Sequence, residues 1–509
     1  MNGPRRSQSL WALACLGLAG SLLVAYAGPR AVGDATLTWW YRPSSPSGRG
    51  ISVAIVYGGM AVLAVAWLGL GRMVAGRAWR APGPLSAREK VPRTGHLLLV
   101  GGLWILPLAL GPVLYSHDVY SYLAQGTILH LGLNPYHDTP IVLARLGHAH
   151  VLAGVSPFWR HTPAPYGPLF LKLMSMIVAV TGSNLVAGAL VVRALELAGV
   201  ALLAVFLPRL AGALGTDPAR AVWLVLLSPL VMLELVAAGH NDVLMIGLLI
   251  AGVTLALEGR PLLGVTLCAL AATIKIPALA AAVFIAVAWA RAEPTPAAQV
   301  RFLLRSGLLT LALLAAVSLV SGLGVSWLSS SVFSAPAKVR LAITPSTGIG
   351  WTAAALLRDV GLSVDSRTIE SAFGVAAAAL TAAAGLLLLY RLRVPRLAPY
   401  LGAFLLMAAA GGPAAWPWYF TWGLCILAGC RGPQRSGGLA LAIAASVFLV
   451  KPNGILALPL GTAPVVVAIY AFVAGAAWYA RRGPGGDRGA AGRSNSSLAD
   501  GAPSALVRT

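Results

Sequence analysis

Charged side chains are scarce in this 509-residue chain, and acidic ones are the scarcest. Only 10% of its residues are charged, with 15 Asp and Glu against 37 Lys and Arg, whereas 58% are hydrophobic and the mean hydropathy is +0.80. A soluble domain carries about 25% charged residues, because its surface must be solvated. The shortage excludes a soluble enzyme and a disordered protein. It predicts an all-α polytopic membrane protein, since helices satisfy their own backbone hydrogen bonds in lipid.

Cysteine is equally rare. The four cysteines, Cys15, Cys268, Cys425 and Cys430, all fall in apolar runs and lack metal-ligand spacing, which excludes a disulfide scaffold and predicts that they pack as small hydrophobes. The chain also lacks a Gly-rich phosphate loop, a metal-ligand triad and a convincing Ser/His/Asp arrangement. We therefore predict no metal site from the sequence.

What the sequence does have is a series of apolar runs. A spanning helix needs about 20 largely apolar residues, and about 14 runs approach that length. They begin near Ser9, Ile51, His96, Leu185, Ala221, Val243, Leu262, Pro277, Leu303, Glu370, Leu397, Trp416, Gly437 and Thr462.

The basic residues orient these runs. With the N-terminus (residues 1–8) in the cytoplasm, 24 of the 37 Lys and Arg residues fall in alternate gaps on the cytoplasmic side, as the positive-inside rule expects. The net charge of +22 is then explained by topology, and no basic stripe on a folded domain suggests nucleic-acid binding. Residues 9–480 form the membrane domain, and the Gly-, Ala- and Ser-rich segment 481–509 is expected to be a flexible cytoplasmic tail. We expect a multi-pass protein of the plasma membrane.

The apolar segment from Tyr166 to Thr181 needs a separate decision. A span there would invert every later gap, so we predict a helix that lies at the outer face. The longest outer loop then covers residues 115–183, and it is rich in polar residues, prolines and tyrosines, which indicates an ordered loop.

Asp118 is the main candidate for chemistry. It follows a predicted span and lies between His117 and two tyrosines. A carboxylate beside the membrane core is costly and usually functional, so Asp118 is a candidate general base for a hydroxyl nucleophile. The alternative is a helix cap, because a helix is expected from Val119 to Leu131.

Other polar and aromatic residues gather in the predicted outer loops. Glu234 and Asp242 flank the outer end of one span, and Lys275 lies near the outer end of another. This indicates either an ion pair of Lys275 with Glu234 or Asp242, or a polar floor that binds sugar or phosphate. Trp416 and Trp418 are explained either by an interfacial aromatic belt or by stacking on a sugar. Basic residues that could hold an anion or anchor the interface are Arg160, Lys172, Lys338 and Arg340.

Several motifs resemble those of a known family. They are Ser116-His117-Asp118-Val119-Tyr120-Ser121-Tyr122, Gly132-Leu133-Asn134-Pro135-Tyr136, Val155-Ser156-Pro157-Phe158-Trp159-Arg160, Thr162-Pro163-Ala164-Pro165-Tyr166-Gly167-Pro168, Gly239-His240-Asn241-Asp242, Thr344-Pro345-Ser346-Thr347-Gly348, Pro417-Trp418-Tyr419 and Lys451-Pro452. Together they resemble the actinobacterial polyprenol-phosphomannose-dependent α-1,6-mannosyltransferases, which are GT-C class integral-membrane enzymes. The chain departs from the family where Asn134 replaces a common Asp and where Asp242 replaces a frequent Glu, so the branch and the acceptor stay open.

The resemblance implies a GT-C fold and an inverting reaction at the outer face of the membrane. Mannose would pass from β-linked polyprenol phosphomannose to the 6-hydroxyl of an α-1,6-mannan core, in lipomannan and lipoarabinomannan synthesis, with Asp118 as the base. The partners implied are this lipid-linked donor, a mannan or glycolipid acceptor and membrane lipids, and the need for a divalent cation is left open. Residues expected to contact the substrates are His117, Tyr120, Tyr122, Asn134, Tyr136, Arg160, Tyr166, His240, Asn241, Asp242, Lys275, Trp416 and Trp418.

Two alternatives remain at this point. A glycolipid flippase would also carry polar groups within an apolar chain, although transporters tend to show inverted repeats around a midplane site, and no matching breaks are visible in the two halves. A GT-C transferase of another sugar or acceptor is the second alternative.

Overall fold

Helices are the only regular structure in the described part of the chain. The computed structural model of the protein describes residues 3–32, 46–75, 94–328, 344–412 and 414–455, together with positions 464 and 467. No β-strand occurs in these ranges. The all-α prediction is therefore confirmed for the described residues.

Six helices are long and apolar enough to cross a membrane. They lie in α1 (Gly3–Val32), α2 (Pro46–Ala75), α7 (Leu185–Ala213), α12 (Pro296–Ser321), α15 (Ser366–Tyr390) and α16 (Leu397–Gly411), the last extended at its start by η8 (Val394–Arg396). A seventh crossing is obtained if η5 (Val231–Ala237) and α9 (Asp242–Leu257), bent by 114° at the intervening break, count as one. The protein is thus a polytopic membrane protein by the length and composition of its helices.

The other apolar runs fold as shorter helices. These are α3 (Thr94–Leu110), α8 (Pro218–Leu224), α10 (Pro261–Ala272), α11 (Leu279–Ala290), α17 (Thr421–Leu427), α18 (Arg431–Gln434) and α19 (Gly437–Ser446). The prediction of about 14 spans is therefore not confirmed. The runs that begin near Leu262 and Pro277 give helices of 12 residues, about 18 Å long against a bilayer core of about 30 Å. The run from Thr462 and the tail 481–509 fall outside the described residues, apart from positions 464 and 467.

Proline determines where several of these runs break. Single 3₁₀ turns follow or precede the short helices: η3 (Pro140–Ala144), η4 (Pro157–Trp159), η6 (Ile276–Ala278), η7 (Ser326–Leu328), η9 (Pro417–Phe420) and η10 (Val447–Leu449). Four of these six turns have Pro at the first or second position, where its fixed φ and missing N–H are tolerated.

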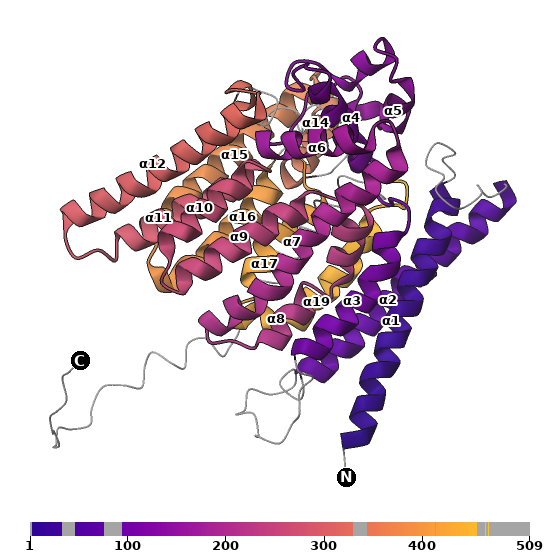
Figure 1. Ribbon diagram of the computed structural model, residues 1–509, viewed down its shortest axis with the longest axis horizontal. Coiled ribbons are helices and arrows are strands. Elements are labelled where there is room, and N and C mark those ends of the chain that lie inside the picture. The colour runs from indigo at the N-terminus through magenta and orange to yellow at the C-terminus, as the bar shows by residue number, and fades with distance from the viewer. Residues whose placement is uncertain are drawn as a thin grey trace.

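The predicted outer loop 115–183 forms a small helical layer at one end of the molecule (Figure 1). It contains α4 (Asp118–His130), α5 (Ala149–Gly154) and α6 (Pro168–Thr181), and α14 (Pro345–Asp359) lies at the same end. Helix α4 packs on α6 and on α7. The predicted helix from Val119 to Leu131 is shifted by one residue, and the predicted segment from Tyr166 to Thr181 is helical from Pro168.

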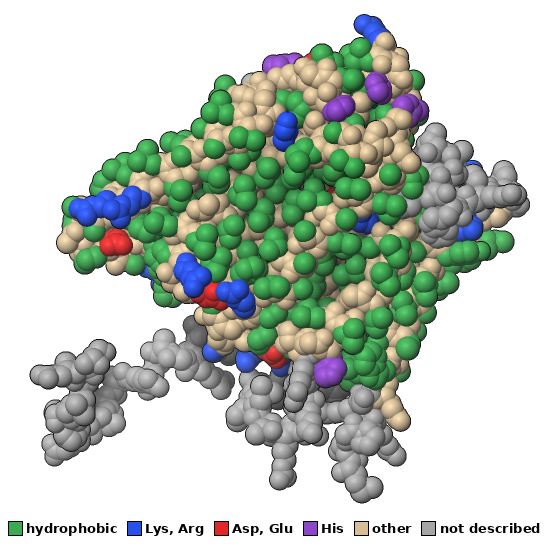
Figure 2. Space-filling view, viewed as in Figure 1, with side chains coloured by type: hydrophobic (Ala, Val, Ile, Leu, Met, Phe, Trp, Pro, Cys, Tyr) green, Lys and Arg blue, Asp and Glu red, His purple; other side chains and the backbone are tan. Residues whose placement is uncertain are grey.

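The surface separates by side-chain type (Figure 2). Hydrophobic side chains cover the middle of the molecule in this view, several Lys and Arg side chains lie near its lower edge, and His side chains lie near the end formed by α4 and α5. Inside, Trp67 and Trp223 stack at 5.1 Å, and each donates its indole N–H to the other's carbonyl oxygen. Such pairing satisfies two indole N–H groups within an apolar core.

Candidate active site

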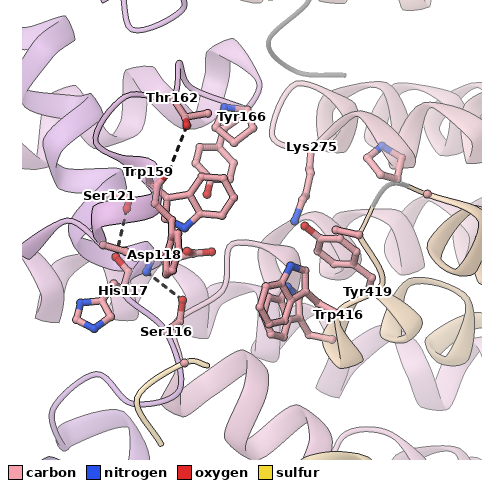
Figure 3. Close-up of a pocket in the computed structure, with 18 of the residues that line it drawn as sticks. Ser116, His117, Asp118, Ser121, Trp159, Thr162, Tyr166, Lys275, Trp416 and Tyr419 are labelled. Carbon is pink, nitrogen blue, oxygen red and sulfur yellow. Dashed lines mark hydrogen bonds between the residues drawn. The ribbon is translucent and has the colours of Figure 1, made fainter. Parts of the chain in front are cut away.

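A cavity of about 450 Å³ lies beside the first turn of α4. Its lining residues come from five segments that are distant in sequence, namely 115–125, 156–166, 275–280, 404–422 and 453–455. Figure 3 shows Asp118 on one side of this cavity and Lys275 on the other, with their side chains turned toward each other. In the described lining, Asp118 is the only carboxylate and Lys275 the only Lys or Arg.

A strained turn at Tyr115 precedes α4 and positions Asp118 at the cavity. Tyr115 is buried and has φ of 62°, and it is the only described non-glycine residue with a positive φ. Its N–H donates to the Pro452 carbonyl oxygen at 2.9 Å, and the N–H of Leu114 donates to the Ala237 carbonyl oxygen at 3.1 Å. A left-handed conformation in a bulky residue is costly and persists only where the surroundings impose it. These two contacts hold the turn from which α4 begins.

The Asp118 carboxylate is free of a capping role. Asp118 is the first residue of α4, and its own N–H is satisfied by Ser116 Oγ at 3.0 Å. No side-chain capping bond is made by the residue at the cap position, His117. The Asp118 side chain is 22% exposed, so it reaches the cavity instead of closing the helix end.

An ion pair holds Lys275 in place, which is one of the two alternatives that the sequence left open. Its Nζ lies 2.8 and 2.9 Å from the two carboxylate oxygens of Asp242, which also accepts from Trp422 Nε1 at 2.6 Å. The ammonium also lies 4.6 Å from the ring centre of Tyr419. Lys275 is 14% exposed and lines the cavity, whereas Asp242 is 1% exposed and does not. Glu234 is fully buried, and neither of its carboxylate oxygens has a hydrogen-bond partner.

An aromatic stack forms the wall beside Lys275. Trp416 and Trp418 both line the cavity, with ring centres 4.7 Å apart and planes 17° apart. Behind them, His240 stacks on Trp418 at 3.9 Å and is completely buried. The neighbouring Asn241 is also completely buried, and its side-chain oxygen and nitrogen have no hydrogen-bond partner. His240, Asn241 and Asp242 therefore lie behind the cavity wall, close to Asp118 and Lys275.

Of the tyrosines expected at the site, one lines the cavity and the others pack around it. Tyr166 lines the cavity, and Tyr122 packs edge-on against it while its hydroxyl accepts from the Asn241 N–H at 3.3 Å. Tyr136 donates its hydroxyl to the Tyr166 carbonyl oxygen at 2.8 Å. Burial raises the pKa of the Tyr136 phenol above its ordinary value, so the group stays protonated and keeps this bond. Tyr120 is buried against Gly154.

The remaining predicted residues shape the loop around the cavity. His117 lines it, with Nδ1 at 3.2 Å from the Gly154 carbonyl oxygen. Asn134 closes its own turn by accepting from the Tyr136 N–H at 3.0 Å. Arg160 donates through Nε to the Val155 carbonyl oxygen at 3.1 Å. Neither Asn134 nor Arg160 lines the cavity, and Lys338 and Arg340 lie outside the described residues.

One flank of the cavity is apolar. It consists of side chains from η6, α11 and α16, namely Ile276, Pro277, Ala280, Phe404, Leu405 and Ala408. Lys275 directly precedes this flank in the chain, and Asp118 faces Lys275 across the cavity. The cavity therefore offers a charged and aromatic end next to a hydrocarbon-like surface.

Sequence reasoning missed three buried residues around this site. Trp422 holds Asp242, and Arg193 donates through its two terminal nitrogens to carbonyl oxygens at the end of α3 and to that of Ala237. Glu196 is 2% exposed, and both of its carboxylate oxygens lack a hydrogen-bond partner. Arg193 and Glu196 are three residues apart in an otherwise apolar span, and such charges inside a span are a signal of function or close packing.

A metal site is not apparent in what the structure describes. Within these ranges, no three His, Cys, Asp or Glu side chains are grouped so that they could hold a metal ion. The charges that shape the cavity are those of the side chains named above.

Comparison with known proteins gives a consistent result. The family described as "Alpha-(1->6)-mannopyranosyltransferase, N-terminal domain" matches residues 13–291. Alpha-(1->6)-mannopyranosyltransferase A of Mycobacterium tuberculosis is 33% identical over 414 residues, which cover 79% of this chain and 76% of the relative. A probable alpha-(1->6)-mannopyranosyltransferase of Mycolicibacterium smegmatis is 34% identical over 450 residues, with the same coverage.

A more distant relative extends the match along the chain. Alpha-(1->6)-mannopyranosyltransferase B of Corynebacterium glutamicum is 28% identical over 495 residues, covering 90% of this chain and 79% of the relative. No solved structure gives a significant match. The likeness thus includes the segments that line the cavity, and it favours a transferase over the flippase that the sequence left open. The chain belongs to the alpha-(1->6)-mannopyranosyltransferase family and is a glycosyltransferase.

Proposed function

We propose that the protein transfers mannose, with inversion, from polyprenol phosphomannose to the 6-hydroxyl of an α-1,6-mannan acceptor, in the synthesis of lipomannan and lipoarabinomannan. The observation that carries the proposal is the arrangement of charge in the cavity. One carboxylate, Asp118, faces one ammonium, Lys275, across a space that also has an aromatic wall and an apolar flank. A base, an anion-binding cation and a lipid-compatible surface are what this reaction needs.

Asp118 acts as the general base in this proposal. Its carboxylate takes the proton of the acceptor 6-hydroxyl, and the oxygen attacks C1 of mannose from the face opposite the phosphate. The bond from C1 to the phosphate oxygen breaks, and its electron pair leaves with the lipid phosphate. A single displacement converts a β-linked donor into an α-linked product. Positioned bases of this kind contribute about 10²–10⁴-fold to a rate.

Lys275 offsets the charge of the departing phosphate. Its ammonium is fixed by Asp242 and by the ring of Tyr419, so little reorganisation is needed when negative charge develops. Trp416, with Trp418 stacked against it, supplies a flat face for the sugar, and the apolar side chains of α11 and α16 suit the first isoprene units of the donor. This assigns the sugar end of the donor to the charged part of the cavity.

The orientation in the membrane follows from the positive-inside rule. Helix α1 begins at the end of the molecule opposite to α4, α5 and α6 (Figure 1), so a cytoplasmic N-terminus places the cavity at the extracytoplasmic side. That side is where the proposed lipid-linked donor would meet a growing mannan. Because a growing mannan is met outside the cell, we place the protein in the plasma membrane. The positive-inside rule then puts both termini in the cytoplasm.

A transfer assay with purified protein tests the proposal. Radiolabelled mannosyl phosphoryl polyprenol and a synthetic α-1,6-dimannoside should give a trisaccharide with a new α-1,6 bond. The variant Asp118→Asn keeps the shape of the side chain but cannot accept the proton, and we expect its rate to fall at least about 100-fold.

The matched control is Asp359→Asn. Asp359 is exposed at the last position of α14, at the same end of the molecule and outside the cavity, so its rate should equal that of the wild type. Failure of the wild type to lengthen the acceptor with this donor, while a different sugar donor is used, would contradict the proposed function. Substantial activity in Asp118→Asn would contradict only the assignment of the base.

A further inference from the structure

His240 lies directly behind Asp118 and is not needed by the mechanism above. Its Nε2 is 3.6 Å from Asp118 Oδ2. The imidazole is completely buried and stacks on Trp418, which separates one ring face from the cavity. A buried imidazole facing a carboxylate that is itself open to the substrate has the geometry of a two-residue proton acceptor.

The tautomer of His240 follows from its other nitrogen. Nδ1 is hydrogen-bonded to the backbone carbonyl oxygen of Glu234. Because a carbonyl oxygen only accepts, Nδ1 carries the hydrogen and Nε2 of the neutral ring presents a lone pair. Nε2 has no hydrogen-bond partner. Nε2 and Asp118 Oδ2 are therefore two acceptors that face each other at 3.6 Å.

Complete burial opposes a charge on the His240 ring, and the neighbouring carboxylates of Asp118 and Asp242 act against that cost. The charged groups that act on the His240 ring are Asp118, Asp242 and Lys275. Glu196 approaches from α7, where its Oε2 would lie 3.1 Å from a Cβ placed on Gly239. With Lys275 paired to Asp242, the Asp118 carboxylate supplies an uncompensated negative charge beside the ring. An added proton would turn the facing acceptors into a charge-assisted hydrogen bond.

We propose that His240 receives, through Asp118, the proton that leaves the acceptor hydroxyl. This inference rests on the proposed function. The acceptor O6–H bond breaks and its proton passes to Asp118 Oδ2, while O6 bonds to C1 and the phosphate leaves with the electron pair of the C1–O bond. A small shift of the carboxylate closes the 3.6 Å gap to hydrogen-bond length, and the proton moves to Nε2. The product state holds imidazolium beside carboxylate, and release of the proton to water restores the enzyme.

The role of His240 as an acceptor is separable from a role in holding Asp118. In His240→Gln, the amide nitrogen occupies the place of Nε2 and can donate to Asp118, as the protonated ring would, but it cannot take up a proton. The control is His130→Gln, which makes the same change at the exposed last residue of α4. Rates of a single turnover, measured from acid to neutral pH with the labelled donor and dimannoside, give both the rate and its dependence on pH.

We expect His240→Gln to be at least about tenfold slower than the wild type, at the lower end of acid–base contributions. The acid limb of its profile should also move to lower pH, because carboxyl groups titrate below imidazoles. His130→Gln should match the wild type in both. A slow variant whose acid limb stays in place would mean that His240 only positions Asp118 and would overturn the inference, as would an unchanged rate.

The wild-type enzyme provides a second measurement that does not depend on the folding of a variant. Ionisation of imidazole has a large enthalpy and that of a carboxyl group a small one, so warming should move the acid limb to lower pH if His240 holds the proton. A limb that does not move with temperature would overturn the inference. A wild type that transfers no mannose at any pH would instead count against the proposed function.

Discussion

The ion pair of Lys275 and Asp242 is expected to contribute both to the stability of the fold and to the transfer reaction, and substitutions can separate the two contributions. In Lys275→Met, Asp242 keeps only its bond from Trp422, although it is 1% exposed. Removing one partner of a buried pair costs about 3–5 kcal/mol, because the remaining charge is uncompensated. In Asp242→Asn, by contrast, Lys275 is 14% exposed at the cavity and can turn to water, so we expect a smaller loss of about 1–3 kcal/mol.

The double variant Lys275→Met/Asp242→Asn separates stability from chemistry. It removes both charges, and replacing both members of a buried pair is often close to neutral, so most of the lost stability should return. Activity should not return, because no cation would then face the departing phosphate. The melting temperature in detergent and the mannosyl transfer rate are measured on the wild type, both single variants and the double variant.

Two results would refute this reasoning. Equal or lower stability of Asp242→Asn relative to Lys275→Met would show that the difference in exposure does not decide the cost. Recovery of activity in the double variant would show that Lys275 serves only to neutralise Asp242. A variant at Lys172, which lies on α6 and does not line the cavity, is the control for general loss of positive charge.

Two further predictions concern the backbone and the topology. Gly239 has φ of +69°, and a Cβ there would lie 2.6 Å from Val119 Cγ2. Gly239→Ala should therefore lose about 1–3 kcal/mol of stability and most of its activity. A melting curve and the transfer assay measure both, and wild-type values would contradict the prediction. A cysteine at His150 should react with a membrane-impermeant maleimide on intact cells and a cysteine at Arg260 should not, relative to the unaltered chain, whereas the reverse pattern would invert the proposed orientation.

Simple physical requirements were enough to predict two features of the site. A helix was expected from Val119 to Leu131, with Asp118 as a possible cap, and α4 begins one residue earlier, so that Asp118 is its first residue. An ion pair of Lys275 with either Glu234 or Asp242 was one of two alternatives, because a charge near the membrane requires a partner, and the structure shows the pair with Asp242. In both cases the physical requirement is local or involves very few candidates.

The breaks in the apolar runs were not predictable in the same way. Apolar composition is shared by a spanning helix and by a short buried one, and tertiary packing decides between them. The residues of α10, η6 and α11 read as two spans, but the chain turns at Lys275 so that its ammonium reaches Asp242. The role of Arg193 was likewise hidden, because its partners are backbone carbonyl oxygens, which any sequence provides.

The bond between Tyr115 and Pro452 has a consequence for biogenesis. A membrane protein is inserted from its N-terminus onward, and the turn that aims Asp118 depends on a carbonyl oxygen near the far end of the described chain. Residues 453–455 then close the same cavity. If Asp118 and Lys275 act as proposed, an unfinished chain that lacks residues 452–455 would carry both side chains without the closed cavity that the reaction needs.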